Sequence, residues 1–223
     1  MNPTAIFTLL TLVVSYLYAA GFYLAGMRWH TPAAQAVGVG YMFIPAAVVF
    51  VVQRLLVRED IVRALEIRWR PNRWWMVAWI LPAALSLATL GISLLLPGVA
   101  YSPEMAGLWA RFQSVFPAEA LEQMKKQTAL LPVHPFWLAL VQGLIAGATI
   151  NAVAAFGEEL GWRGFLLREL SHLGFWRASL YTGLIWGVWH APLILQGHNY
   201  PQHPQAGVLM MVAWCVLLSP LFA

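Results

Sequence analysis

Long apolar segments separated by short polar ones dominate the pattern of this chain. They lie at roughly residues 5–25, 37–56, 75–97, 136–156, 178–196 and 206 to the end. Each is close to the ~20 residues that an α-helix needs to cross the hydrocarbon core of a bilayer. The pattern therefore predicts an all-α fold, a polytopic transmembrane helix bundle with about six spans, in one integral membrane domain covering residues 1–223.

Composition agrees with this prediction and excludes several other classes. The chain is 61% hydrophobic and only 10% charged, with a mean hydropathy of +0.68, which is far more apolar than a soluble domain. The first apolar segment lacks a basic flank and is longer than the core of a signal peptide, so it is predicted to be a transmembrane helix. Cys215 is the only cysteine, which excludes a disulfide framework and a thiolate metal site.

The distribution of arginine predicts the orientation in the cell membrane. Six of the thirteen basic residues lie between Arg54 and Arg73, in the connection of the second and third segments. The positive-inside rule makes this loop cytoplasmic, which also places the N-terminus in the cytoplasm. The sequence pI is near 9.5, but no basic face is interleaved with stacking aromatics on a soluble module, so no nucleic-acid partner is expected.

The connection 98–135 then lies on the outer side. Its stretches 105–116 and 118–127 have the pattern of short amphipathic helices on a membrane surface. A solvated loop with helical turns fits the same pattern equally well.

The fourth segment ends in a charged motif, FGEELGWRGFLL, at residues 156–167. No proline interrupts the segment, so we expect one helix that continues past the bilayer on the cytoplasmic side. On such a helix Glu159 and Arg163 are four residues apart and share a face. Glu158 is rotated by about 100° from Glu159 and has no local partner. A carboxylate in this position, facing the bundle interior, can serve as a general base on water.

A second group must hold the water or pass the proton on. The stretch LIWGVWHAPLIL, residues 184–195, contains His190, a histidine in the middle of an apolar run. Trp186 lies four residues earlier on the same face, and Pro192 is expected to bend the helix and to free backbone carbonyls. The remaining histidines fall in polar connections, where surface positions are expected: His30, His134, His172, His198 and His203.

Each of the two motifs also has a purely structural interpretation. A Glu, Glu, Arg group at a helix end is often an ion pair at the membrane boundary. A histidine beside tryptophans often forms a hydrogen bond within a bundle and does nothing more. The two motifs together favour a reaction site, because the fourth and fifth segments are joined by a short loop and are antiparallel neighbours.

These residues resemble the signatures of one known family. EELGWRG, which begins at Glu158, matches an E-E-x-x-x-R motif, and WGVWH resembles an F-x-x-x-H motif with Trp186 in the phenylalanine position. On residues of about 130–223 the chain resembles the CAAX prenyl protease type II and bacteriocin-processing family (CPBP, Abi) of intramembrane glutamic endopeptidases.

The resemblance implies a metal-independent intramembrane endopeptidase without a cofactor, cutting a peptide bond near the cytoplasmic membrane face. It implies that Glu158 and His190 activate the water and that Glu159 and Arg163 form a supporting ion pair. The implied partners are the lipid bilayer and a peptide or protein substrate, with or without a prenyl group.

One expected feature is absent from the printed chain. The family has a third motif, a histidine followed four residues later by asparagine or a related residue, which is expected to stabilise the oxyanion. No H-x-x-x-N follows His190. Because the last apolar segment stops abruptly without capping residues, we expect the natural chain to continue into further helices beyond Ala223.

Three other functions remain open on the sequence. Two glutamates and a histidine suit zinc chemically, although no H-E-x-x-H motif is present. Buried carboxylates and a histidine also suit a proton-coupled transporter, although no repeated halves are visible. A non-catalytic immunity or scaffold protein could retain the motif as structure.

Overall fold

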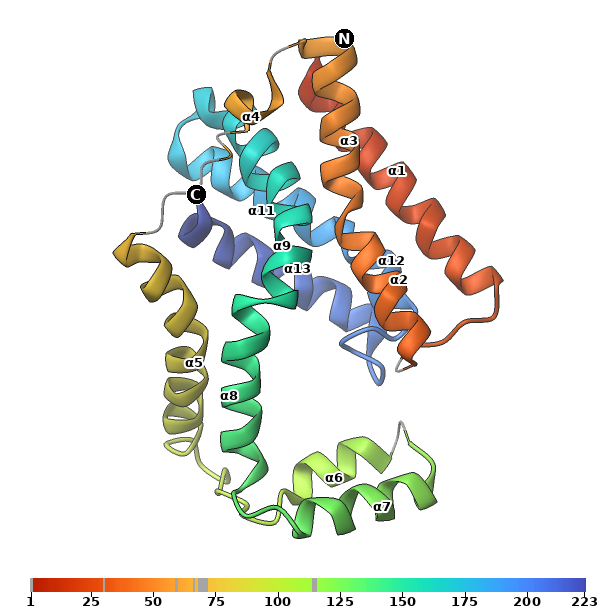
Figure 1. The fold of residues 1–223 in the computed structure, drawn as a ribbon, viewed down its shortest axis with the longest axis vertical. Coiled ribbons are helices and arrows are strands. Elements are labelled where there is room, and N and C mark those ends of the chain that lie inside the picture. Colours follow the sequence, from red (N-terminus) through yellow and green to blue (C-terminus); the bar gives the residue numbers. More distant parts are fainter. Residues whose placement is uncertain (1, 30, 59, 66, 68–71, 114–115) are drawn as a thin grey trace. The chain divides into compact units, whose positions relative to one another are not determined.

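The computed structural model describes residues 2–29, 31–58, 60–65, 67, 72–113 and 116–223, and these are helical with no β-strand among them (Figure 1). His30 and several residues of the predicted cytoplasmic loop lie outside the described residues. The chain forms two compact units, residues 1–69 with 153–223, and residues 70–152. The predicted all-α fold is confirmed.

Within the described residues, five helices are long and apolar enough to cross a membrane: Pro3–Leu24, Ala34–Val57, Arg73–Ser93, Phe175–Leu195 and Pro204–Phe222. The helices Pro135–Ala148 and Ile150–Leu173 make a sixth span if the two are counted together. These ranges agree with the predicted segments to within a few residues, apart from the longer fourth one. The protein is a multi-pass membrane protein.

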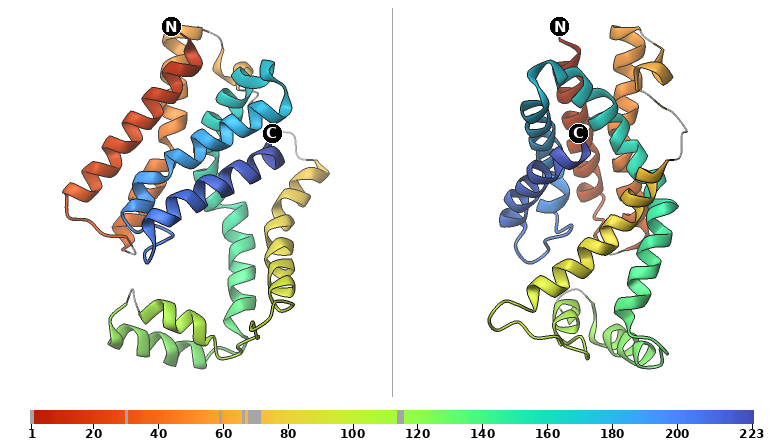
Figure 2. Two further views of the ribbon diagram at one scale, coloured as in Figure 1. Left: turned by 180° about the vertical axis from the view of Figure 1, so that it is seen from behind. Right: turned by 90° about the vertical axis from the view of Figure 1, so that its left-hand side faces the viewer.

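The first unit contains the candidate site. Its N-terminal elements are α1 (Pro3–Leu24), α2 (Pro32–Met42), α3 (Ile44–Val52), the π-helix η1 (Gln53–Val57) and α4 (Ile61–Ala64). Its C-terminal elements are α9 (Ile150–Glu159, from residue 153 on), the π-helix η2 (Leu160–Leu167), α10 (Arg168–Leu170), the 3₁₀ turn η3 (Ser171–Leu173), α11 (Phe175–Trp189), α12 (Ala191–Leu195) and α13 (Pro204–Phe222). Helices α11 and α13 run side by side, and α1 lies against α3 (Figures 1 and 2).

The N-terminal helix α1 buries one narrow stripe and exposes the rest of its surface. Phe7, Thr11, Ser15 and Ala19 follow one another at intervals of four residues and are fully buried. Residues at this spacing lie on one face of a helix, and this face meets α3, η2 and α11. Leucines and valines cover the outer face, as expected for a helix that faces lipid.

Two glycines allow the backbones of α11 and α13 to approach closely. A Cβ atom at Gly183 would lie 2.6 Å from the carbonyl oxygen of Cys215, and one at Gly187 would lie 2.6 Å from the Cα atom of Val212. This four-residue spacing of small residues is typical of helix pairs packed in membranes. The glycines therefore hold α11, the helix that carries Trp186, against α13.

Replacing Gly187 by alanine is expected to destabilise the protein by about 1–3 kcal/mol, because the nearest obstructing atom, the Cα of Val212, is backbone and cannot move aside. The matched control is Gly21→Ala in α1, where a new Cβ meets no atom within 4 Å and helix propensity predicts a small gain. Reversible unfolding in detergent measures both changes. Equal stability of the two variants would contradict the close packing of α11 on α13.

The second unit is formed by α5 (Arg73–Ser93), α6 (Ala106–Gln113), α7 (Ala118–Ala129) and α8 (Pro135–Ala148). The indole Nε1 of Trp79 on α5 donates a hydrogen bond of 2.7 Å to the carbonyl oxygen of Leu144 on α8. Helices α6 and α7 cover the two stretches for which amphipathic helices were predicted, so a loop with isolated helical turns is the wrong alternative there.

The prediction of one uninterrupted fourth helix is wrong. The chain leaves helical geometry at Thr149, with φ −122° and ψ −102°, between α8 and α9. The Thr149 hydroxyl donates a 2.7 Å hydrogen bond to the carbonyl oxygen of Ile145, and its N–H donates to the carbonyl oxygen of Ala146. Threonine side chains that bond the preceding turn bend helices without any proline, which is why a search for proline did not predict this break.

Candidate active site

Glu158 lies in the last turn of α9 and is buried, with 8% of its surface exposed. The neighbouring Gly157 allows α9 to approach the junction of α2 and α3, since a Cβ there would lie 2.9 Å from the carbonyl oxygen of Met42. The close approach removes water from this turn of the helix. A carboxyl group held in such surroundings requires a polar partner from the protein.

That partner comes from α11. The indole Nε1 of Trp186 donates a hydrogen bond of 3.1 Å to Oε2 of Glu158. As the helical spacing predicted, the hydrogen-bond partner of Glu158 lies on a neighbouring helix and not on its own. The predicted proximity of the fourth and fifth segments is therefore present at the residues that carry the two motifs.

Glu159 and Arg163 form the predicted ion pair, with 2.9 Å between Oε1 and the guanidinium NH1. The Arg163 guanidinium also lies over the ring of Trp186, 4.3 Å from its centroid, and 4.9 Å from that of Phe222. Contacts of a cation with aromatic faces contribute about 0.5–2 kcal/mol. Arg163 thus links Glu159 to the tryptophan that binds Glu158.

The backbone that carries Arg163 is a π-helix, η2, which begins directly after Glu159. Segments of this kind are rare and often occur at functional sites, because they rotate the following side chains relative to a regular helix. Phe165 and Leu166 within η2 are fully buried in the core with Phe7 and Trp162. This packing fixes η2, and with it the helix end that carries Glu158.

His190 lies at the break between α11 and α12, where Pro192 predicted a bend. Pro192 has no N–H to donate to the carbonyl oxygen of Val188. The N–H of His190 donates to Gly187, and the N–H of Leu193 donates to the carbonyl oxygen of His190, both at 3.2 Å. The regular i to i−4 bonding of the helix is interrupted here, which frees carbonyl groups inside the membrane domain.

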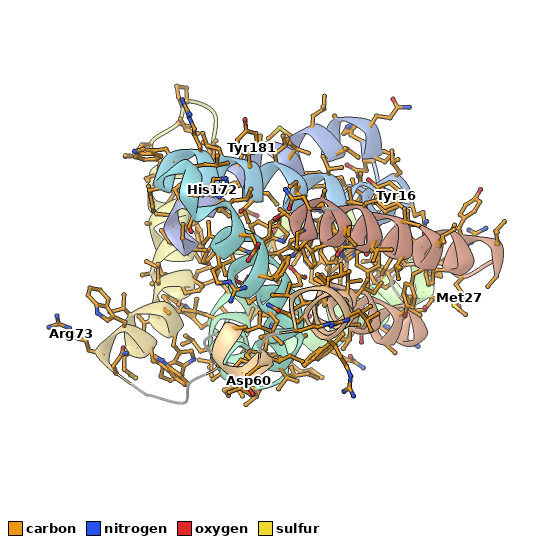
Figure 3. All side chains as sticks on the ribbon, turned by 90° about the horizontal axis from the view of Figure 1, so that it is seen from above. Tyr16, Met27, Asp60, Arg73, His172 and Tyr181 are labelled. Carbon is orange, nitrogen blue, oxygen red and sulfur yellow. The ribbon has the colours of Figure 1, made fainter. Side chains whose placement is uncertain are left out.

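Three of these carbonyls find side-chain partners. The Trp186 carbonyl oxygen lies 2.8 Å from Nδ1 of His190. The Val188 carbonyl accepts a hydrogen bond of 2.8 Å from the Tyr16 hydroxyl, and the Trp189 carbonyl accepts one of 2.7 Å from Tyr41. Figure 3 labels Tyr16 on the side of α1 that faces α11 and α12. Side chains therefore bond the carbonyls of residues 186, 188 and 189 at the break.

The bond to Trp186 determines which nitrogen of the His190 ring carries the proton. A carbonyl oxygen can only accept, so Nδ1 is the donor. In the neutral ring, Nε2 then has a free lone pair that can accept a hydrogen bond or a proton. The imidazole also meets the rings of Trp186 and Trp189 edge-on, at centroid distances of 5.8 and 4.8 Å.

Of the other described histidines, His134, His172 and His198 have local partners of their own. His134 caps α8, where Nδ1 accepts from the N–H of Phe136 and Nε2 contacts the carbonyl oxygen of Pro103. His172 and His203 are exposed, as predicted. His198 is only half-exposed, because its ring lies 4.6 Å from that of Trp29 between centroids.

The zinc alternative requires a set of ligand side chains gathered at this site. Among the described residues, no three His, Cys, Asp or Glu side chains lie close enough together to hold a metal ion. Catalytic zinc is usually held by three protein ligands. Glu158 and His190 by themselves do not fit that requirement.

Sequence reasoning missed the residues of the N-terminal helices that bond the backbone carbonyls next to His190. Tyr16 and Tyr41 are separated from their carbonyl partners by 172 and 148 residues. Ser15 of α1 also accepts a 2.7 Å hydrogen bond from the indole Nε1 of Trp189. The one available signal was Pro192, which predicted free carbonyls but not their donors.

The fold and the site define a multi-pass membrane protein in which a buried carboxyl group and an imidazole are both bonded to one tryptophan. Residues 132–223 match the sequence model of the family described as "Rce1-like: Type II CAAX prenyl endopeptidase Rce1-like". This range agrees with the residues of about 130–223 for which the motifs indicated a resemblance. The match supports the CPBP family that the motifs predicted.

One curated relative supports the same family. A segment of 49 residues is 43% identical to "CAAX prenyl protease 2" of Methanococcus maripaludis. The segment covers 22% of this chain and 18% of that protein, so the chain spans about a fifth of the length of the relative it matches. No solved structure matches the chain.

Proposed function

We propose that this protein is an intramembrane endopeptidase of the CAAX type that hydrolyses a peptide bond near the cytoplasmic membrane face. The observation that carries the proposal is the arrangement around Trp186, whose indole N–H binds Glu158 and whose carbonyl binds His190. Trp186 thus links a potential general base to an imidazole within the membrane domain, which supports placing the two groups in one site. The family match supports peptide hydrolysis as the reaction.

In the proposed reaction Glu158 accepts a proton from a water molecule while Nε2 of His190 accepts a hydrogen bond from the same water. The water oxygen attacks the carbonyl carbon of the peptide and forms a tetrahedral intermediate. Collapse of the intermediate breaks the C–N bond, and the proton on Glu158 moves to the leaving nitrogen. The Glu159–Arg163 pair and the packing of η2 hold Glu158 in position.

We further propose that the reaction needs no metal, since the two catalytic side chains fall short of the ligand set of a catalytic zinc. In the full-length protein, reconstituted in lipid vesicles, cleavage of a membrane-anchored peptide is expected to keep its rate after treatment with a chelator. The metal content of the purified protein is measured in parallel. Loss of activity that zinc restores would favour the zinc enzyme instead.

The proposed substrate is a peptide or protein at the membrane. Whether this substrate must carry a prenyl group is a separate question. The relative is named a CAAX prenyl protease, which makes a prenylated cysteine near the scissile bond the first substrate to test. Two peptides of identical sequence, one farnesylated and one unmodified, separate the requirement for the lipid from the requirement for the sequence.

The proposed orientation in the cell membrane has a cytoplasmic N-terminus. The basic connection after the second span and the positive-inside rule support it. Single cysteines introduced at Asn2 and in the loop after Gln196 would label from opposite sides of the membrane. Labelling of Asn2→Cys by an impermeant reagent from outside would reverse the assignment.

A further inference from the structure

Helices α1 and α2 lie outside the part of the chain that matches the family, yet they bond to the helix break at His190. We propose that Tyr41 of α2 is a positioning residue for His190, holding the imidazole in the Nδ1–H form by bonding the Trp189 carbonyl. The expected effect on catalysis rests on the proposed function, but the effect of Tyr41 on the tautomer of His190 can be measured separately.

The geometry around the break defines two alternative bonding patterns. In an uninterrupted helix the N–H of His190 would donate to Trp186, and the N–H of Leu193 would donate to Trp189. In the structure the N–H of His190 donates to the carbonyl oxygen of Gly187 instead, and the N–H of Leu193 donates to the carbonyl oxygen of His190. The carbonyls of Trp186 and Trp189 are therefore released together, as two results of the same break.

Each released carbonyl is used by a different side chain. The Trp186 carbonyl accepts from Nδ1 of His190, which sets the tautomer of the ring. The Trp189 carbonyl accepts from the Tyr41 hydroxyl at 2.7 Å. If Tyr41 did not bond the Trp189 carbonyl, the donor of the regular helical pattern, the N–H of Leu193, would be available to replace it. Restoring that bond would restore regular helix at the break. The N–H of His190 would then donate to the Trp186 carbonyl oxygen and displace the imidazole Nδ1 from it.

Burial makes the tyrosine hydroxyl difficult to replace by water. Tyr41 and Trp189 are each 1% exposed, and their rings pack against each other at a centroid distance of 4.5 Å with an interplanar angle of 35°. An unbonded carbonyl in such surroundings is strongly unfavourable. The indole of Trp189 is held in turn by Ser15, which is fully buried. Residue 189 is thus fixed at both its backbone and its side chain.

The experiment compares Tyr41→Phe with the matched control Tyr18→Phe in the full-length protein. Tyr18 is exposed and donates a longer bond of 3.2 Å, to the carbonyl oxygen of Val37. Nitrogen-15 NMR of histidine-labelled protein reports the tautomer of His190, whose signals are assigned by their loss in His190→Ala. His134 serves as an internal reference, because its bonds place the proton on Nε2.

The wild type and Tyr18→Phe are expected to show His190 protonated on Nδ1 in the neutral ring. Tyr41→Phe is expected to show a mixture of both tautomers and a kcat lower by about three- to tenfold, from the loss of one buried hydrogen bond. The KM should stay within about twofold of the wild-type value, since Tyr41 is buried and is proposed to act through the backbone at residue 189.

Each other outcome decides a different claim. A wild-type His190 protonated on Nε2 would overturn the positioning role without any variant, even if Tyr41→Phe failed to fold. An unchanged tautomer and an unchanged kcat in Tyr41→Phe would also overturn it, while leaving the endopeptidase intact. A tautomer that depends on Tyr41 in a protein without peptidase activity would support the structural role and refute the proposed function.

Discussion

Replacing Glu158 by glutamine is expected to lower kcat/KM for peptide cleavage about 10²- to 10⁴-fold, the range that general-base catalysis contributes. The amide cannot take a proton from water. Its oxygen can still accept the hydrogen bond from Trp186 Nε1, so the packing around α9 should persist. The measurement is the rate of cleavage of a membrane-anchored peptide, with yield and thermal unfolding in detergent recorded for the same samples.

The matched control is Glu122→Gln, which makes the same chemical change at an exposed glutamate of α7 paired with Lys125. It should leave cleavage unchanged. Full activity in Glu158→Gln would show that another group acts as the base. If instead this variant abolished an ion or solute flux in proteoliposomes that lack peptidase activity, the protein would be a transporter.

Replacing His190 by alanine is expected to reduce cleavage by a similar factor of about 10²–10⁴, because the imidazole that we propose orients the water is removed. The more informative variant is His190→Asn. Its side-chain amide can still donate to the Trp186 carbonyl in place of Nδ1, but it has no counterpart of Nε2. Asparagine should therefore restore stability relative to alanine without restoring activity.

The exposed His203 provides the control, and His203→Ala should retain wild-type rates. Recovery of cleavage in His190→Asn would show that activity requires the hydrogen bond to the Trp186 carbonyl oxygen and does not require Nε2. That result would assign His190 to structure alone, which is the alternative interpretation that the sequence left open.

The link between Glu158 and His190 depends on a feature of this chain and not of the motif. The family motif has phenylalanine where this chain has Trp186, and only the indole carries an N–H that can reach Glu158. The ring itself contacts both Arg163 and His190. Trp186 therefore combines the packing expected of the motif with one additional hydrogen bond.

The sequence by itself determined the helical class, the approximate spans and the candidate side chains. Apolar runs of about twenty residues are enough to predict membrane helices, because every backbone group in lipid must be bonded within its own segment. The Glu159–Arg163 pair could also be predicted, since residues four apart on a helix are neighbours whatever surrounds them.

Only the tertiary structure decided which groups meet. The break at Thr149 depends on a side-chain bond that competes with the helix, and helix propensity alone does not reveal it. The orientation of Glu158 toward Trp186 depends on how η2, the segment directly after Glu158 and Glu159, packs against α11. The bond from Tyr41 to Trp189 joins residues 148 positions apart, and contacts at such separation follow from the packing of whole helices and not from local spacing.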